Sequence, residues 1–185
     1  SATTVVSEKA AQKAFEIMTQ TYGNPSSLHF MGLQAERELE AARKSVAKRL
    51  GVQTDELYFT SGGTEANNTA LFGTAQAKKR RGNRIVVSAV EHSSIVEAAN
   101  KLESDGFEVV RIAPRADGII YADDVAAAVD SGTILVSVML VNNETGAIMP
   151  IDKIFSAVRA KNPDVVCHTD AVQAFGKIKI NAKRL

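Results

Sequence analysis

The stretch RIVVSAVEHSSIVEAANKLESDGFEVVRI, residues 84–112, decides the fold of this chain. It contains an apolar run at Ile85–Ala89, a stretch with helical spacing of apolar residues at Ser94–Glu103, and a second apolar run at Val109–Ile112. Runs without polar alternation are typical of strands buried on both faces, and a helix between two such strands makes them parallel. The stretch therefore predicts a strand–helix–strand unit.

The same alternation continues on both sides of this unit. Further apolar runs lie at Leu57–Thr60, Ile134–Leu140 and Val165–Cys167, and further helical stretches lie at Glu65–Lys79, Ala122–Val129 and Ile151–Lys161. We predict an α/β fold with a mostly parallel sheet and helices on both faces, in which the runs at 85–89, 134–140 and 165–167 are neighbours. Right-handed crossovers place the carboxyl ends of all strands at one edge, where ligands bind in such folds.

The chain ahead of this alternation is predicted to be helical. Ser7 is a good N-cap for a helix that ends near Gly23, and the turn-rich segment Gly23–Ser27 follows it. Apolar residues spaced by three and four predict an amphipathic helix over Ala35–Leu50, and Gly51 suits a left-handed C-cap.

The composition excludes several classes of protein. With 185 residues, 45% of them hydrophobic, the chain fits one domain, with N-terminal helices and a loop in 1–55 and the α/β core in 56–185. Because 22 Lys+Arg face 21 Asp+Glu, nothing indicates binding to nucleic acid or to an anionic membrane. Ile134–Val141 is too short to span a bilayer and no leader opens the chain, so we expect a cytoplasmic protein. One cysteine and three His argue against a disulfide framework and a metal site.

Polar residues follow the predicted strands at the ligand-binding edge. The segment Thr60–Asn67 carries two glycines and hydroxyl groups at the start of a helix. It suits a bound phosphate and an ordinary capped turn about equally. Taken singly, the residues that follow the other strands have plain structural explanations: His92 as a surface side chain, Asn143 as part of a turn and Asp170 as a helix N-cap.

Taken together, these groups predict a cofactor. A phosphorylated aromatic ring with a basic nitrogen needs a phosphate cradle, a flat side chain against the ring, a carboxylate that keeps the nitrogen protonated, and amides for the ring hydroxyl. The combination indicates pyridoxal 5'-phosphate. The groups in these roles are the helix start within Thr60–Asn67 for the phosphate, His92 for the ring face, Asp170 for the ring nitrogen, and Asn143 with Gln173 for the ring hydroxyl.

The ordered motifs of the chain resemble those of the cysteine desulfurases in the class V aminotransferase family, which use pyridoxal phosphate. The motifs that carry the resemblance are Ser1–Thr4, Gly23–Ser27, Phe59–Asn68, Glu91-His92, Val141–Glu144 and Asp170–Gln173. The resemblance implies the same roles as above: phosphate binding at Gly63 and Thr64, ring stacking and catalytic proton transfer at His92, contact of Asn143 with ring hydroxyl and substrate, and of Asp170 and Gln173 with the ring nitrogen and hydroxyl.

The resemblance also implies which groups lie elsewhere. Family members carry a later Ser-Gly-His-Lys motif, whose lysine forms the Schiff base, and a mobile loop with the cysteine that accepts sulfur, whereas this sequence stops at Leu185. Cys167 lies in an apolar run, where a thiol is more often inert packing than a nucleophile. We therefore expect the incomplete large domain of a fold-type I enzyme, inactive by itself.

The expected activity of the parent enzyme is the conversion of L-cysteine to L-alanine. Its sulfur would be delivered as a persulfide for iron–sulfur cluster or thio-cofactor assembly. The resemblance further implies a homodimer, and a scaffold protein that accepts the sulfur is an expected partner. Two alternatives stay open: a selenocysteine lyase or another class V enzyme, and a truncated non-catalytic module that serves in dimerisation.

Overall fold

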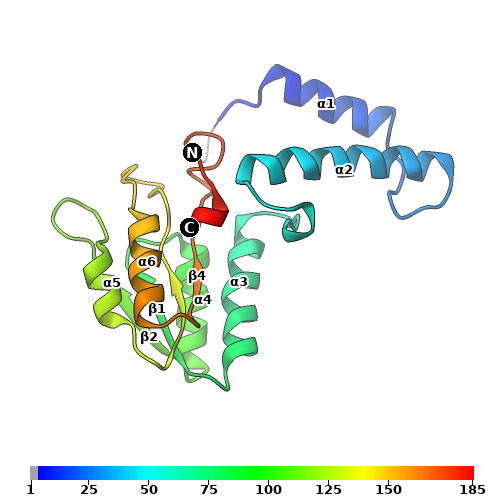
Figure 1. Cartoon of the computed structure of the whole chain (residues 1–185). Helices are drawn as coiled ribbons and strands as arrows, with labels where there is room; N and C mark the ends of the chain where they lie inside the picture. The colour runs from blue at the N-terminus through cyan, green and yellow to red at the C-terminus, as the bar shows by residue number, and fades with distance from the viewer. Residues whose placement is uncertain (1–3) are drawn as a thin grey trace. The chain divides into compact units, whose positions relative to one another are not determined.

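The computed structural model describes residues 4–185, so all of the Ser1–Thr4 motif except Thr4 lies outside the described residues. The chain forms two compact units (Figure 1). The first holds the described residues up to Tyr58 together with Ile180–Lys183, and the second holds Phe59–Lys179 with Arg184–Leu185. That residues 1–185 make one domain stays a prediction.

The first unit is built from two helices. Helix α1 (Glu8–Thr19) begins at Ser7, whose hydroxyl accepts a hydrogen bond from the amide of Ala10 at 3.3 Å. Helix α2 (Phe30–Leu50) begins five residues before the predicted start and ends, as predicted, at Gly51 with a left-handed φ of 72°. A short 3-10 helix, η1 (Thr54–Glu56), follows. The local signals at the helix ends therefore act as the sequence predicts.

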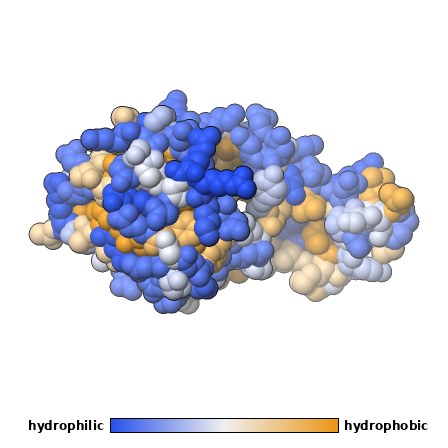
Figure 2. All heavy atoms as spheres, turned by 90° about the horizontal axis from the view of Figure 1, so that it is seen from below, coloured by the Kyte–Doolittle hydropathy of each residue, from blue (hydrophilic) through white to orange (hydrophobic). Residues whose placement is uncertain are grey.

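This unit buries little of its apolar surface. Helix α1 has no buried residue, and α2 buries only Gly32 and Ala47. Phe15 and Met18 of α1 are 63% and 68% exposed, and Phe30 of α2 is 70% exposed. Hydrophobic atoms are accordingly visible on the surface in Figure 2. Large apolar side chains exposed in this number favour association with another surface.

The second unit contains a parallel sheet of four strands in the order β2-β1-β3-β4. The three expected neighbours therefore lie side by side, which confirms the predicted arrangement. Val86 in the middle of β1 lies opposite Val110 of β2 and Val136 of β3. The strands are β1 (Arg84–Ser88), β2 (Glu108–Ile112), β3 (Thr133–Ser137) and β4 (Val166–His168).

Helices cover the sheet on both faces, which confirms the predicted α/β class. Leu71 of α3 (Gly63–Lys78) and Ile95 of α4 (Ser93–Ser104) form a buried cluster with Ile85 and Val87 of β1. Alternate strand residues point to the opposite face, and Figure 1 shows α5 (Ala122–Ala128) and α6 (Ile151–Lys161) on that side. A last 3-10 helix, η2, spans Ala182–Arg184.

The predicted strand at Leu57–Thr60 is wrong. The segment pairs with none of the strands β1–β4, and Tyr58 is 82% exposed. A guanidinium nitrogen of Arg43 donates to the carbonyl oxygen of Leu57 instead. An apolar run becomes a strand only where a neighbouring strand accepts its backbone hydrogen bonds. The run at 134–140 also ends as a strand at Ser137, three residues early.

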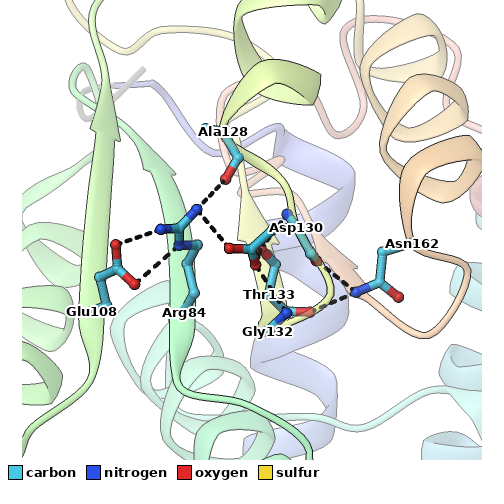
Figure 3. Close-up of polar contacts among 7 residues, drawn as sticks. All are labelled: Arg84, Glu108, Ala128, Asp130, Gly132, Thr133 and Asn162. Carbon is cyan, nitrogen blue, oxygen red and sulfur yellow. Dashed lines mark hydrogen bonds and ion pairs between the residues drawn. The ribbon is translucent and has the colours of Figure 1, made fainter.

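A network of polar contacts around Arg84 links the strands at the amino-terminal edge of the sheet (Figure 3). Its guanidinium donates to both carboxylate oxygens of Glu108 at 3.0 and 2.7 Å and lies 2.8 Å from a carboxylate oxygen of Asp130. Asn162 donates to the carbonyl oxygen of Asp130 at 2.9 Å and to that of Thr133 at 3.2 Å. These contacts fasten the starts of β1, β2 and β3 to one another.

Candidate functional site

The start of α3 presents backbone amides that the helix does not use. The first helical hydrogen bond runs from the amide of Ala66 to the carbonyl of Gly62, so the amides of Gly63 and Thr64 precede the ladder. A Cβ atom at Gly62 would meet nothing within 4 Å, and Thr64 is exposed. Free amides, open space and a helix N-terminus together make a site that can hold an anion such as phosphate.

Glu65 stabilises this turn without filling it. Its Oε2 accepts hydrogen bonds from the hydroxyl and the amide of Ser61 at 2.6 and 2.7 Å. These hydrogen bonds hold the pKa of the Glu65 carboxyl below its usual value. The carboxylate therefore shapes the loop that leads into α3.

Asp170 lies buried directly after β4, beside the start of α3. It is only 8% exposed, and its Oδ1 accepts from the amide of Val172 at 2.9 Å. Its Oδ2 accepts from Nδ2 of Asn67, on the second turn of α3, at 2.7 Å. A Cβ atom at Gly63 would lie 3.0 Å from Val172. The structure thus brings Gly63 and Asp170 together, although the run at Leu57–Thr60 ahead of Gly63 is not a strand.

His92 caps α4 and keeps its ring exposed. Nδ1 of the ring accepts from the amide of Ser94 at 3.2 Å and lies 2.9 Å from the Ser94 hydroxyl. That hydroxyl in turn accepts from Nδ2 of Asn67 at 2.9 Å. Asn67 and Ser94 therefore connect His92 to Asp170 although 78 residues of sequence separate the two.

Asn143 shares a cavity with His92. The cavity has a volume of about 540 Å³ and is lined by residues 89–93 and 142–145 together with Pro114 and Gly118. Asn142 builds the turn: its Oδ1 accepts from the amides of Glu144 and Thr145, and its Nδ2 donates to the carbonyl of Val90 at 3.0 Å. Asn142 is therefore occupied with backbone, and the exposed Asn143 is available to a ligand.

Glu91 is a site residue to which the sequence analysis gave no role. Its Oε1 accepts from the Ser88 hydroxyl at 2.6 Å and from the Met139 amide at 2.7 Å, which joins the ends of β1 and β3. Its Oε2 is buried and has no partner within residues 4–185. Burial raises the pKa of the Glu91 carboxyl to about 7; the hydrogen bonds from Ser88 and Met139 oppose this rise and the charge of Asp170 adds to it.

Gln173 is not joined to the other predicted residues. Its Oε1 accepts from Nζ of Lys177 at 3.3 Å, four residues further along the chain. Asn67 and Ser94, which make the connection, had no assigned role, although both lie within the quoted motifs or next to them. One signal in the sequence could have found Asn67 and Ser94. Each is a polar residue at a helix position that faces the sheet, and a polar side chain buried there needs hydrogen-bond partners.

Two further residues near this edge, Cys167 and His168, are half-buried. Nδ1 of His168 lies 2.9 Å from the Ser137 hydroxyl, and burial lowers the pKa of its imidazole despite the nearby charge of Asp170. Burial also raises the pKa of the Cys167 thiol, with a smaller opposing effect of Arg159. Within the described part of the chain, no cluster of His, Cys, Asp or Glu could hold a metal ion. No helix there is long and apolar enough to cross a membrane.

Comparison with known proteins finds relatives that match nearly the whole length of this chain. A family model described as Aminotransferase class-V matches residues 1–185. A NifS/IcsS protein homolog of Lactobacillus delbrueckii subsp. bulgaricus is 50% identical over 96% of this chain and 46% of its own length. A cysteine desulfurase IscS of Clostridium botulinum is 40% identical over 99% of this chain and 46% of its own.

The solved structures agree with the sequence relatives. A structure described as a NifS-like protein is 36% identical and superposes with a TM-score of 0.95 over 99% of this chain and 50% of its own. The chain therefore spans about half the length of the curated relatives and of the solved chain that it matches.

Proposed function

Since this chain belongs to the class V aminotransferase family, we propose that it forms the cofactor-binding part of a pyridoxal-phosphate-dependent cysteine desulfurase. Membership confirms the family resemblance found in the sequence motifs. The observation that carries the proposal is the buried connection from Asp170 through Asn67 and Ser94 to His92, beside the open start of α3. The relative named cysteine desulfurase IscS supports the choice of reaction.

The residues fit pyridoxal phosphate on a test that is independent of the relatives. Asp170 is a buried carboxylate, and no ion pair reaches it within residues 4–185. A buried carboxylate is costly unless a positive charge accompanies it. A protonated pyridine nitrogen supplies that charge. The open amides at Gly63 and Thr64 suit the phosphate at the other end of the same cofactor.

Each predicted residue then has one task. Gly63 and Thr64 bind the phosphate through the start of α3, and Asp170 keeps a proton on the ring nitrogen. His92 packs against the ring, while Asn143 and Gln173 hydrogen-bond the ring hydroxyl. When bound, pyridoxal phosphate supplies an electron sink for the carbon skeleton of the amino acid. The fixed ends of β1, β3 and β4 hold these groups in register, which is how a site lowers the entropy cost of reaction.

The proposed overall reaction converts L-cysteine to L-alanine. The carbon–sulfur bond of the substrate breaks, carbon takes up a proton, and sulfur passes to a cysteine thiolate as a persulfide. Cys167 is a poor acceptor because its raised pKa keeps it as a thiol. We therefore assign the acceptor cysteine to a residue outside this chain, and the family resemblance assigns the lysine that binds the cofactor there as well.

The proposal also covers the location, the oligomeric state and the sulfur acceptor of the enzyme. We propose that the enzyme is a cytoplasmic homodimer that delivers sulfur through a scaffold protein to iron–sulfur cluster or thio-cofactor assembly. The exposed apolar residues of α1 and α2 support the dimer. The location and the scaffold partner rest on the family resemblance alone.

Replacing Asp170 by Asn tests the proposed function. Asn keeps the size of the side chain but cannot stabilise a positive ring nitrogen, so Asp170→Asn should weaken binding of pyridoxal phosphate at least about tenfold. The measurement is titration of the natural protein that contains these residues, followed by cofactor absorbance and sulfide release from L-cysteine. The control is Asp164→Asn, whose carboxylate is 71% exposed at the opposite edge of the sheet. Unchanged cofactor binding in Asp170→Asn would falsify the proposal.

A further inference from the structure

The buried side chains of Asn67 and Ser94 connect Asp170 to His92 through hydrogen bonds. Asn67 of α3 is 4% exposed and Ser94 of α4 is 7% exposed. Nδ2 of Asn67 lies 2.7 Å from Oδ2 of Asp170 and 2.9 Å from Oγ of Ser94. Oγ of Ser94 lies 2.9 Å from Nδ1 of His92. Polar groups at such depth are retained where their hydrogen bonds are satisfied.

The chemistry of these groups fixes the direction of every hydrogen bond. Both oxygens of Asp170 accept, one from the Val172 amide and one from Asn67. The side-chain nitrogen of Asn67 can only donate, so Ser94 Oγ must accept from it. Because Nδ1 of His92 accepts from the Ser94 amide, it has no proton to give, and the Ser94 hydroxyl donates to it. The amide of Ser94, 3.2 Å from the same nitrogen, can also only donate.

We infer that Asn67 and Ser94 are positioning residues that hold His92 as the Nε2–H tautomer. Two donors converge on Nδ1, so that nitrogen keeps its lone pair and the neutral ring carries its proton on Nε2. The ring is exposed beside the cavity that it shares with Asn143. His92 therefore presents a hydrogen-bond donor to this cavity, and the group that it receives there is an acceptor, such as a carboxylate or a thiolate.

This inference deepens the proposed function, because it states which atom of His92 meets the ligand and in which protonation state. His92 would orient or protonate an acceptor at Nε2 instead of removing a proton with that atom. Asp170 sets this state from a distance, since its charge fixes the orientation of the Asn67 amide. A negative charge at the buried end thus selects the tautomer at the exposed end.

The chain contains its own reference for the measurement. His29 caps α2 with Nδ1 accepting from the amide of Gly32 at 3.3 Å. Across the described residues, no side-chain donor to that nitrogen is recorded. His29 therefore has a backbone cap like that of His92 without the Asn67–Ser94 connection. Single His→Gln variants assign the imidazole signals of His29, His92 and His168 within the natural protein.

The experiment is nitrogen NMR of the natural protein labelled with ¹⁵N-histidine, without added cofactor and at a pH where the rings are neutral. Long-range proton–nitrogen correlations distinguish a protonated from an unprotonated ring nitrogen. We expect His92 to show a protonated Nε2 and an unprotonated Nδ1. In Ser94→Ala the Nδ1 signal should move toward the position of a ring that averages both tautomers. Asn67→Ala should move it in the same direction by a smaller amount.

Neighbouring residues provide matched controls. Ser93→Ala and Asn68→Ala remove the same groups one position away, and the His92 signals should stay at their wild-type positions. Unchanged His29 and His168 signals show that each variant is folded. A protonated Nδ1 in the wild type would overturn the tautomer assignment. Wild-type signals in Ser94→Ala would overturn the role of Ser94, and wild-type signals in Asn67→Ala that of Asn67.

The result is separable from the proposed function. The NMR pattern reads the imidazole itself, whereas the cofactor titration reads the whole site. A protein that fails to bind pyridoxal phosphate but shows the Nε2–H pattern refutes the proposed cofactor and retains the inference. The reverse outcome retains the cofactor and refutes the positioning role.

Discussion

The carboxyl group of Glu91 lies out of water where β1 and β3 end. One of its oxygens holds the Met139 amide and the Ser88 hydroxyl, and the other has no partner among the described residues. Burial is the main reason why its pKa rises to about 7 from an ordinary value of 4.5. The protonation state of this residue therefore affects stability in the range where enzymes work.

The first prediction concerns the pH dependence of stability. Between about pH 4.5 and 7 the folded chain keeps a proton on Glu91 that the unfolded chain releases. The free energy of unfolding should therefore fall as pH rises through this window, by about 3 kcal/mol at most. Glu91→Gln cannot ionise and keeps an acceptor for Ser88 and Met139, so it should lack this loss.

Urea unfolding of wild type and variant at pH 5 and pH 8 provides the measurement. The lowered pKa of His168 acts in the opposite sense, because the stability that comes from keeping this half-buried imidazole neutral is lost as pH falls below about 6.5. That contribution is common to both proteins and cancels in their difference. Glu97→Gln, on the exposed side of α4, should follow the wild type. Parallel pH profiles for wild type and Glu91→Gln would contradict the argument.

The sequence could identify residues that follow strands but could not identify the residues that connect them. His92, Asn143 and Asp170 were found because each comes after an apolar run, at the edge where parallel strands end. Asn67 and Ser94 lie on helices whose inward faces become known only when the sheet is in place. The hydrogen-bond partner of a buried polar group often lies far away in the sequence, so the local spacing of residues does not identify it.

At the scale of the element, α3 connects the candidate site to the core. Its first turn offers amides at Gly63 and Thr64, its second turn carries Asn67, and its third carries Leu71, which is fully buried. Successive turns of α3 thus have different tasks: the first faces the ligand, the second hydrogen-bonds to Asp170 and Ser94, and the third packs in the apolar core. The helix holds the site because its far half packs against the sheet.

The second prediction is that Leu71→Ala destabilises the second unit by about 2–5 kcal/mol, because it removes a fully buried side chain and leaves a cavity. Denaturant unfolding followed by circular dichroism measures the loss. Leu39→Ala on α2 is the matched control: Leu39 is 38% exposed, and its replacement should cost less than about 1 kcal/mol. Equal losses for the two variants would show that α3 does not anchor the core.

The prediction of elements succeeded where the signal is local. Ser7, Gly51 and the helical spacing of Ala35–Leu50 act within one helix, and the structure has these features. The run at Leu57–Thr60 has the composition of a strand, but a strand needs a partner that composition does not name. The predicted range of β3 is likewise too long, because apolar residues continue beyond the last residue that pairs with a neighbouring strand.

At the scale of the whole molecule, the two units differ in how they bury apolar surface. The second has a dense core of fully buried residues such as Ile85, Leu135 and Ile154, whereas the first leaves Phe15, Met18 and Phe30 largely exposed. An apolar surface without a cover favours association with another chain.

The third prediction is therefore self-association through the first unit. Light scattering over a range of concentrations should show a species larger than the monomer. Phe15→Ser combined with Met18→Ser should shift the distribution toward the monomer, since both side chains lie on one face of α1. Lys9→Ser on the same helix should leave the distribution unchanged. A monomer at the highest concentration would argue against the proposed dimer.

The fourth prediction is negative: residues 1–185 alone should release no more sulfide from L-cysteine than free pyridoxal phosphate does. Cys167 is held as a thiol by its raised pKa. Borohydride reduction followed by peptide mapping should find little cofactor on any single lysine. Lys177, whose ammonium contacts Gln173 at 3.3 Å, is the lysine to inspect first. Stoichiometric trapping there, abolished by Lys177→Arg, would show that the catalytic lysine lies within this chain.

The strand order has a consequence for how the protein is made. Strand β1 is central, yet its neighbour β3 is synthesised about 45 residues later. At a translation rate of about 5–20 residues per second, the side of β1 that pairs with β3 therefore stays open for several seconds, while β2 becomes available to the other side about halfway through this interval. Until β3 emerges from the ribosome, the nascent chain displays an unpaired row of backbone groups along an apolar strand. Such an edge is what chaperones shield and what aggregation begins from. A pause in translation between Ile112 and Thr133 would prolong this exposure.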